Sequence, residues 1–405
     1  MREMKDSGVE WIGEIPKDWE IIKCKYLLRI QSGDSIANDD ISNDAKYPVF
    51  GGGECMGYTD LFNVSDANIL VGRVGARCGC ITNLKSKAWA TDNSLIISCI
   101  DNIGNKDYLS YLLDALDLHT LNTSNAQPLI TSNKIKNCYI VFTYENDQQT
   151  RIVNYLDSKC SQIDSIIEKQ QIIIEKLKEY KLSVITETIT KGINPDVEMK
   201  YSGSVWFGDI PKNWEMKRLK YVFHIQKDIV GEEGHTVLSI TQRGIVPKDF
   251  SNNDGQFANS YANYQLVHVG NFAMNHMDLL TGWVDISKYE GVTSPDYRVF
   301  VLDDTEINYS EYFLYLMQMC YSARIFYGLG QGVSGMGRWR LQADKFLNFR
   351  IPVPPFSEQK AIAEYVDTKI VEIERSIEKR TKLIEKLQEY KKSLIYEVVT
   401  GKKEV

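Results

Sequence analysis

A duplication that spans most of the chain constrains its fold more than any other feature. Residues 11–20 (WIGEIPKDWE) recur at residues 206–215 (WFGDIPKNWE), and residues 149–192 align with residues 359–402, with 20 of 44 positions identical. The offset is 195 residues for the first repeat (206 − 11) and 210 for the second (359 − 149). Solenoids and propellers repeat every 20–50 residues or so. The sequence therefore predicts two copies of a whole module.

The longer repeat predicts two long helices. Residues 149–191 contain neither proline nor glycine, and the same is true of residues 358–400. Their apolar residues recur at alternating steps of three and four, which is the a/d spacing of a left-handed coiled coil. Further apolar positions widen the stripe, so we expect each helix to pack on its own domain as well. The predicted helix-pair interface consists of Leu156, Ile163, Ile167, Ile174, Leu177, Val184, Ile370, Ile373, Ile377, Ile384, Leu387 and Leu394.

The helix ends carry capping signals. Ser357 is the predicted N-cap of the second long helix, and Asn146 or Asp147 is the predicted cap of the first. Gly192 and Gly401 follow the two periodic patterns, where a left-handed residue commonly ends a helix.

Polar positions within the apolar seam favour an antiparallel pair. Lys181 and Lys391 occupy equivalent seam positions in the two copies, as do Gln170 and Arg380. A parallel, in-register pair would place Lys181 against Lys391 and bury two like charges together. An antiparallel pair avoids this repulsion and relates the two halves by a pseudo-twofold axis.

The stretches between the repeats do not align with each other, and both predict strands. They contain short apolar runs between turn residues, at 68–72, 94–98, 236–240 and 296–301. Each also contains one apolar helical run (108–118, 310–327) and ends in a strand (137–142, 348–353) that leads into a long helix. The predicted fold class is α+β, with two β-rich globular domains joined by two long helices that pair as an antiparallel coiled coil.

The same patterns set the expected domain boundaries. A first β-rich domain, including the N-terminal repeated element, is expected at residues 1–147, and the first long helix at 148–192. The second β-rich domain is expected at 193–356, with its repeated element from about residue 201, and the second helix at 357–405.

Composition excludes several classes of protein. No run of about 18 uncharged apolar residues exists, so no membrane-spanning helix is expected. The start of the chain lacks the apolar core of a secretion signal, and eight cysteines without a regular framework indicate a reducing cytoplasm. The formal net charge of −7 argues against nucleic-acid binding by bulk positive charge alone.

The motifs expected of an enzyme of this size are missing. The sequence contains no phosphate-binding loop of the Gly-x-x-x-x-Gly-Lys-Ser/Thr type, no His-Glu-x-x-His pair, no Gly-x-Ser-x-Gly elbow and no Asn/Asp-Pro-Pro-Tyr/Phe motif. Its five histidines are scattered and predict no metal site. We therefore expect a chain that recognises rather than catalyses, and we disfavour a self-sufficient nuclease or methyltransferase.

The repeated elements resemble those of the specificity subunit of type I restriction–modification systems. The resemblance rests on the Ser-Gly-x-x-Trp-x-Gly-x-Ile-Pro-x-x-Trp-Glu element, on the PPFSEQK helix entry at residues 354–360 and on the duplicated helix. It covers essentially the whole chain, although residues 143–149 depart from the proline-rich entry of the second copy. It implies two target-recognition domains that each read half of a split DNA site.

The resemblance also implies partners. Two methyltransferase (modification) subunits would dock on the paired helices, and restriction/translocase subunits would join through that core. No cofactor is expected on this chain, because S-adenosylmethionine, ATP and Mg²⁺ would belong to those partner subunits.

Base reading requires donor and acceptor groups in the major groove, and phosphate contacts require basic or hydroxyl side chains and backbone N–H groups. Glycine-rich loops that carry Arg let the backbone approach DNA closely. The DNA-binding candidates are Arg73, Arg77, Lys85, Lys87 and Asn93 in the first domain, and Gln242, Arg243, Lys248, Asn275, His276, Arg338 and Arg340 in the second. Each is alternatively an ordinary solvated surface residue.

Local charge does not favour either domain as a simple DNA binder. Residues 20–147 contain 11 basic and 15 acidic side chains, and residues 215–356 contain 13 and 15. Partner subunits could then supply most of the phosphate affinity. A separate alternative function is a two-module assembly scaffold that binds proteins rather than DNA. The motif order favours the DNA reader.

Overall fold

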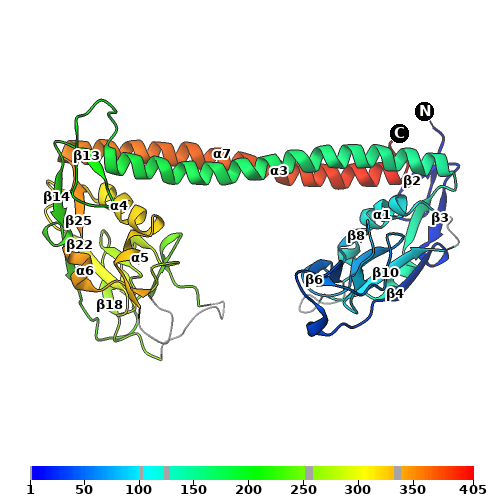
Figure 1. The fold of residues 1–405 in the computed structure, drawn as a ribbon, viewed down its shortest axis with the longest axis horizontal. Coiled ribbons are helices and arrows are strands. Elements are labelled where there is room, and N and C mark those ends of the chain that lie inside the picture. The colour runs from blue at the N-terminus through cyan, green and yellow to red at the C-terminus, as the bar shows by residue number, and fades with distance from the viewer. Residues whose placement is uncertain (1, 101–103, 123–127, 251–258, 333–338) are drawn as a thin grey trace. The chain divides into compact units, whose positions relative to one another are not determined.

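The computed structural model describes residues 2–100, 104–122, 128–250, 259–332 and 339–405 (Figure 1). The chain divides into two compact units. Unit 1 comprises residues 1–171 and 380–405, and unit 2 comprises residues 172–379. Each of the two long helices therefore contributes one part to each unit.

Unit 1 combines small sheets with two short helices. Its strands are β1 (Met4–Asp6), β2 (Glu14–Pro16), β3 (Glu20–Lys23), β4 (Leu28–Ser32), β5 (Tyr47–Gly51), β6 (Glu54–Thr59), β7 (Ile69–Gly72), β8 (Ile81–Asn83), β9 (Trp89–Ala90), β10 (Ser94–Cys99) and β11 (Tyr139–Phe142). Its helices are α1 (Lys106–Ala115) and α2 (Ser132–Asn137), with 3-10 turns at Cys24–Tyr26, Asn38–Asp40 and Leu118–Leu121. The long helices α3 (Asn146–Lys191) and α7 (Phe356–Val399) complete it.

An antiparallel sheet of order β4-β10-β7-β8 lies at the centre of unit 1. Successive side chains of a strand point to opposite faces of the sheet. In β7, Ile69 and Val71 belong to the main core, whereas Leu70 belongs to a second cluster with Ala88 and Ala90. Both faces of the sheet are therefore covered, which explains why the sequence of this strand is a continuous apolar run.

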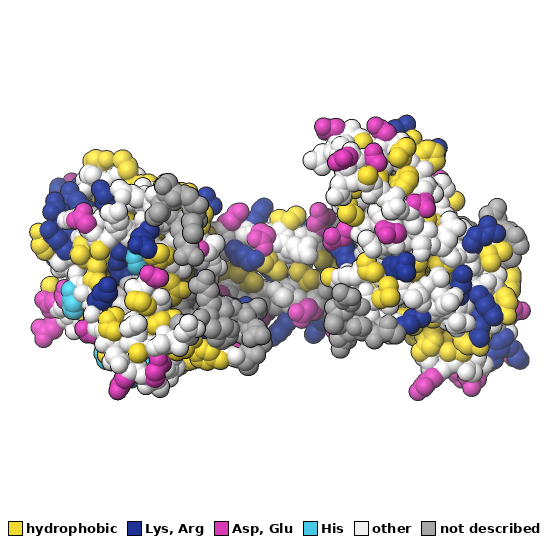
Figure 2. Space-filling model, turned by 90° about the horizontal axis from the view of Figure 1, so that it is seen from below, with side chains coloured by type: hydrophobic (Ala, Val, Ile, Leu, Met, Phe, Trp, Pro, Cys, Tyr) yellow, Lys and Arg dark blue, Asp and Glu magenta, His cyan; other side chains and the backbone are white. Residues whose placement is uncertain are grey.

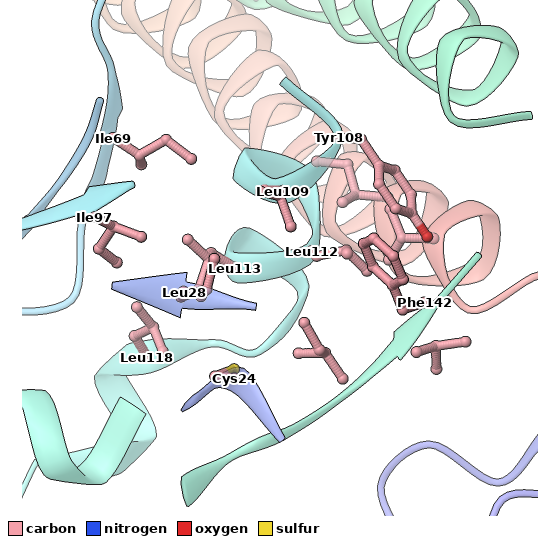
Figure 3. Packing of buried hydrophobic residues seen from close by; sticks show 14 of the residues in the cluster. Cys24, Leu28, Ile69, Ile97, Tyr108, Leu109, Leu112, Leu113, Leu118 and Phe142 are labelled. Atoms are coloured by element: carbon pink, nitrogen blue, oxygen red, sulfur yellow. The ribbon is translucent and has the colours of Figure 1, made fainter. Parts of the chain in front are cut away.

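Helix α1 packs against one face of this sheet. Figure 3 shows Leu113 of α1 beside Leu28 of β4, with Leu112 on the side of Phe142, and all four belong to the main core. The helix begins at a capped position, because the Asn105 side chain accepts hydrogen bonds from the backbone N–H groups of the first turn. The main core continues from α1 onto residues of α3 and α7.

Unit 2 contains more strands than unit 1. They are β12 (Met199–Tyr201), β13 (Asp209–Pro211), β14 (Glu215–Arg218), β15 (Phe223–Gln226), β16 (Leu238–Thr241), β17 (Gly244–Pro247), β18 (Gln265–Val267), β19 (Phe272–Met274), β20 (Val284–Ile286), β21 (Gly291–Thr293), β22 (Arg298–Leu302), β23 (Gln331–Gly332), β24 (Trp339–Arg340) and β25 (Arg350–Val353). Its short helices are α4 (Ser310–Ser322), α5 (Ile325–Leu329) and α6 (Ala343–Asn348), with a 3-10 turn at Leu219–Tyr221.

The two units share one topology although their central sequences do not align. The sheet of unit 2 has the order β15-β22-β19-β20, which corresponds strand by strand to β4-β10-β7-β8. In each unit a strand near the repeated element pairs antiparallel with the strand that leads into a long helix, β3 with β11 and β14 with β25. The prediction of an α+β fold built twice is confirmed. The core of unit 2 is more aromatic, with Phe223 packed edge-on against Phe272, Phe300 and Phe313.

Within each unit the two long helices run antiparallel, as the sequence predicts. In unit 1, Lys391 Nζ donates to both carboxylate oxygens of Asp164 at 2.7 Å, and Arg380 Nη1 donates to Gln170 Oε1 at 2.6 Å. Residue numbers therefore fall along α7 as they rise along α3. In unit 2, Lys181 Nζ donates to Glu374 Oε1 at 2.7 Å. The 210-residue offset of the repeat relates this ion pair to that of Lys391, so each seam lysine faces an acid instead of the other lysine.

A buried glutamine near the start of each long helix joins it to its domain. In unit 1, Gln149 Oε1 accepts from Asn105 N at 2.8 Å, and Gln149 Nε2 donates to Thr143 O at 2.7 Å. In unit 2, Gln359 Oε1 accepts from Tyr309 N at 2.8 Å, and its Nε2 donates to the backbone oxygens of Ile307 and Pro354. Both side chains are almost fully buried. They tie the first turn of the long helix to the start of α1 or α4.

A tyrosine–aspartate hydrogen bond forms a second duplicated joint. The hydroxyl of Tyr111 in α1 donates to Asp157 of α3 at 2.6 Å, and the hydroxyl of Tyr315 in α4 donates to Asp367 of α7. Burial, together with the hydrogen bonds to their carboxylate partners, raises the pKa of both tyrosines, so the hydroxyls remain protonated donors at neutral pH.

The helix starts differ slightly from the expected caps. Helix α7 begins at Phe356, so Ser357 lies inside the first turn rather than at the N-cap. The carbonyl of Pro355 accepts from the N–H groups of Glu358 and Gln359, which moves the start of the helix to the earlier residue. At the other ends, Gly192 and Gly401 have φ of 78° and 73°, the left-handed conformation expected of them.

No helix in the described part of the chain is long and apolar enough to cross a membrane.

Candidate nucleic-acid interface

The loops that follow β7 and β19 occupy the same place in the two units, and both hold predicted DNA-binding residues. Ile130 N donates to Arg73 O in unit 1, and Leu341 N donates to His276 O in unit 2, each at 3.0 Å. These bonds hold each loop against the segment that precedes α2 or α6. Arg73 and His276 are therefore at corresponding positions, just beyond the end of a central strand.

In unit 1, Arg73 is only partly satisfied by the protein. Its Nη1 lies 3.4 Å from Ser32 Oγ and 3.5 Å from Asp92 O, at the limit of hydrogen bonding, and its buried Nε has no partner. Gly72, directly before it, is a place of close backbone approach, because an added Cβ would lie 2.6 Å from Gly52 O. A larger residue at 72 would displace this glycine-rich loop.

The other candidates of unit 1 mostly have partners already. Arg77 Nε lies 2.6 Å from Glu54 Oε1, and Lys85 Nζ lies 3.4 Å from Asp107 Oδ1. Lys87 Nζ lies 4.1 Å from the centroid of the Phe62 ring, a cation–π contact. Asn93 is exposed. Exposed ion pairs are weak, so a DNA phosphate can replace the acidic partner of such a side chain.

The candidates of unit 2 fall into four groups. Asn275 is used by the fold, because its Oδ1 accepts from the N–H groups of Met277 and Asp278 and closes the turn after β19. Gln242 and Arg243 form the exposed turn of the β16–β17 hairpin, and Gln242 Nε2 donates to Thr281 O at 3.3 Å. Lys248 lies at the opposite end of the hairpin, where its N–H donates to Val237 O. Arg338 lies outside the described residues.

His276 and Arg340 come together in a pocket, together with two cationic residues that sequence reasoning missed. The pocket, of about 330 Å³, is lined by Lys227, His276, Asp296, Tyr297, Arg298 and Arg340 among others, and we call it the basic pocket. Arg298 is the first residue of β22 and is 5% exposed, whereas Lys227 follows β15 and is exposed. The sequence shows Arg298 only as part of a predicted strand. Nothing in such a pattern indicates that the arginine faces a pocket.

The electrostatics of the basic pocket are unusual for an acidic chain. Burial lowers the pKa of Arg298 to about 10, and burial together with Arg298 and Arg340 lowers the pKa of His276 to about 3. Arg298 therefore stays charged at neutral pH, whereas His276 is neutral. The Nδ1 atom of His276 is buried and has no hydrogen-bond partner. Buried polar atoms are nearly always paired in folded proteins, so this nitrogen stands out.

A second hollow, in unit 1, has mixed chemistry. It has a volume of about 500 Å³ and is lined by Cys80, Asp114, His119, Lys392 and Tyr396 among others. The hollow is lined by both acidic and basic groups, so it favours neither an anionic nor a cationic ligand. Figure 2 likewise shows basic side chains interspersed with acidic and apolar ones on the face that it draws.

The predicted helix-pair positions lie along the facing sides of α3 and α7. Leu156, Ile163 and Leu394 are buried in the core of unit 1, with Ile167 and Leu387 half-buried against it. In unit 2, Ile373 is buried, and Ile370 is half-buried against the core. The remaining positions, Ile174, Leu177, Val184, Ile377 and Ile384, are half-buried.

Comparison with known proteins decides the family. The sequence matches the type I restriction modification DNA specificity domain twice, over residues 16–179 and 211–386. These matches cover most of both units. The chain belongs to this family.

Relatives extend the match to the full length. A specificity subunit of the type I restriction enzyme MjaVIII from Methanocaldococcus jannaschii is 23% identical over 421 aligned residues, which cover 96% of this chain and 93% of the relative. The specificity subunit of the Escherichia coli enzyme EcoprrI is 26% identical over 150 residues, which cover 36% of this chain and 37% of that one. A chain from a solved structure that concerns complex assembly and conformational transition of the type I R-M system shares the fold, with a TM-score of 0.68 at 11% identity and coverage of 95% and 98%.

The chain is thus a specificity subunit of a type I restriction–modification system, a non-catalytic component that works with DNA and with other subunits of that system. This confirms the resemblance that the sequence motifs indicated.

Proposed function

We propose that each unit of this specificity subunit reads one half of a two-part site in double-stranded DNA. The observation that carries the proposal is the same topology built twice, with different side chains in the loops beyond the central strands. Reading two different half-sites requires one frame that presents two sets of donors and acceptors. Arg73 with its neighbours in unit 1, and Gln242 and Arg243 on the β16–β17 turn in unit 2, supply such donors and acceptors.

The paired parts of α3 and α7 serve as the spacer and as the docking scaffold for two methyltransferase (modification) subunits and for restriction/translocase subunits. The duplicated joints at Gln149 and Gln359 support this role, because they fasten each recognition domain to its long helix in the same way. Two equivalent joints suit two copies of one partner, since identical partners need equivalent surfaces.

The cofactors of the reaction belong to those partners. S-adenosylmethionine, ATP and Mg²⁺ act there, and this chain contributes the choice of sequence. Within the described residues, no group of three or more His, Cys, Asp or Glu side chains is arranged to hold a metal ion. All eight cysteines are free thiols, which is compatible with work in the reducing cytoplasm, where the DNA is.

A domain exchange tests the proposal directly. Residues 20–147 are replaced by the equivalent segment of a relative with a different target, and the genomic methylation pattern of a host carrying the methyltransferase partner is sequenced. We expect one half of the methylated motif to change and the other half to stay the same. The chain should still assemble with its methyltransferase partner. The reciprocal exchange of residues 215–356 should change only the other half. If the motif stays the same in both exchanges, the chain is a protein-binding scaffold and not the DNA reader.

A further inference from the structure

Arg298 is a buried cation without a carboxylate partner among the described residues. One guanidinium nitrogen donates to Leu341 O at 2.8 Å, another lies 3.9 Å from Met274 Sδ, and the group lies 4.9 Å from the centroid of the Phe346 ring. None of these contacts neutralises the charge. Burying an unpaired charge is costly, so such a group is retained when something else compensates it or uses it.

The mouth of the same pocket carries two further cations. Lys227 and Arg340 are exposed and line it, and neither makes an ion pair within the described part of the chain. This contrasts with unit 1, where Arg77 and Lys85 have acidic partners. Three positive charges therefore converge where the protein provides little to balance them.

The structural role of Arg298 does not explain the rest of the pocket. Its bond to Leu341 O joins β22 to the segment before α6, and this would be reason enough to keep the arginine. The same bond leaves unexplained the unpartnered His276 Nδ1 and the two cations at the mouth. The acid in the lining, Asp296, is exposed and acts on Tyr297, whose pKa it raises together with burial and Asp278. It does not pair with the three cations.

We infer that the basic pocket binds a phosphate group of the DNA strand that passes over unit 2. Arg298 supplies positive charge from below, and Arg340 and Lys227 close on the phosphate oxygens from the mouth. Arginine and lysine are the usual partners of phosphate, and a pocket of about 330 Å³ accommodates one diester group with its flanking sugar atoms. This inference rests on the proposed function and names a contact within it.

A phosphate contact has a different signature from a base contact. It fixes the register of the protein on the duplex but carries no sequence information. Losing it weakens binding to all sequences alike and reduces the slope of log affinity against log salt by about one per phosphate. Losing a base contact changes the preferred sequence instead.

The test uses the specificity subunit assembled with its methyltransferase partner, because that assembly is the form that meets DNA. The variant is Lys227→Gln with Arg340→Gln. The matched control is Lys288→Gln with Arg324→Gln, which removes the same charges from exposed positions of unit 2 outside the pocket lining. Both pairs leave Arg298 in place, and equal thermal stability and equal assembly of the two variants guard against unfolding.

We expect the pocket variant to bind target and non-target duplexes roughly tenfold more weakly than the control, with a salt slope smaller by about one and an unchanged methylated motif. Equal affinity and slope in both variants would overturn the phosphate contact while leaving the proposed function intact. A changed motif would show that the pocket reads a base edge and would also overturn it. If the methylated motif stays the same when residues 215–356 are exchanged, the proposed function itself is wrong.

Inorganic phosphate distinguishes a DNA phosphate from a free anion. At constant ionic strength, phosphate in place of chloride should compete with DNA more strongly for the original assembly than for the pocket variant. If phosphate stabilises the pocket of the original assembly while DNA affinity is the same in the two variants, the pocket serves a free anion, and the inference fails.

Discussion

The loops beyond β7 and β19 show how two copies of one frame acquire different chemistry. Both loops are held by the same backbone bond to the chain before the next short helix, at Arg73 in unit 1 and at His276 in unit 2. In unit 1 the neighbouring cations are paired with acids, whereas in unit 2 they converge on a pocket with little compensation. The shared backbone bond fixes the position of each loop, and the side chains around it give each loop its own charge.

The largest expected difference between the two units is in the stability that the buried glutamines Gln149 and Gln359 contribute. Replacing Gln359 by Leu removes three hydrogen bonds and leaves buried backbone groups unpaired, and we expect a loss of about 3 kcal/mol in unit 2. Gln149→Leu removes two such bonds, and about 2 kcal/mol is expected in unit 1. Hydrogen exchange of the strands in each unit measures the two losses separately. Equal, small losses would show that these glutamines are not joints.

A pH titration should distinguish the two loops by a smaller effect. The pKa of His276 lies at about 3 in the folded unit and near 6.5 when unfolded, so the unfolded chain binds the proton first. Stability from this group is present above about pH 6.5 and is lost as the pH falls toward 3. At pH 4.5, two units below the unfolded pKa, we expect unit 2 to lose about 2.5 kcal/mol through this group. His276→Gln should remove this part of the pH dependence and leave that of unit 1 unchanged; an unaltered profile of unit 2 would contradict the burial of this imidazole.

The duplicated ion pairs of α3 and α7 should give the smallest effect. Lys391 donates to both oxygens of Asp164, whereas Lys181 reaches one oxygen of Glu374, and all four side chains are partly exposed. Lys391→Met and Lys181→Met should each cost less than about 1 kcal/mol, with the larger loss at Lys391. Unfolding at low and high salt checks this, because the difference should vanish when the charges are screened. A larger loss at Lys181 would show that the number of contacted oxygens is not what matters.

Much of the fold could be predicted because it depends on local patterns and on charge. The 3–4 spacing located both long helices, and the two seam lysines were sufficient to predict antiparallel pairing. The start of α7 was misplaced by one residue, because the bonds to Pro355 O involve backbone groups and leave no trace in composition.

The site was less predictable, because it is assembled from separate strands. Arg298 lies in an ordinary strand-like run, and Lys227 follows another run 71 residues earlier (298 − 227). Only the pairing of β15 with β22 brings them to one pocket. The sequence did point to His276 and Arg340, but it could not show that Arg77 and Lys85 of unit 1 would have acidic partners whereas the cations lining the basic pocket would have none among the described residues.

The hydrogen bonds from the Tyr111 and Tyr315 hydroxyls to the long helices have a consequence for how the protein can evolve. Each unit also has a backbone N–H group that donates to its buried glutamine. These two hydrogen bonds attach each β-rich domain to its long helix at two points. Any domain that places a tyrosine six residues beyond such an amide, as Tyr111 follows Asn105 and Tyr315 follows Tyr309, can make the same two contacts with the long helix. Under the proposed function, exchange of one such domain would change half of the DNA target while the contacts of the long helices stay the same.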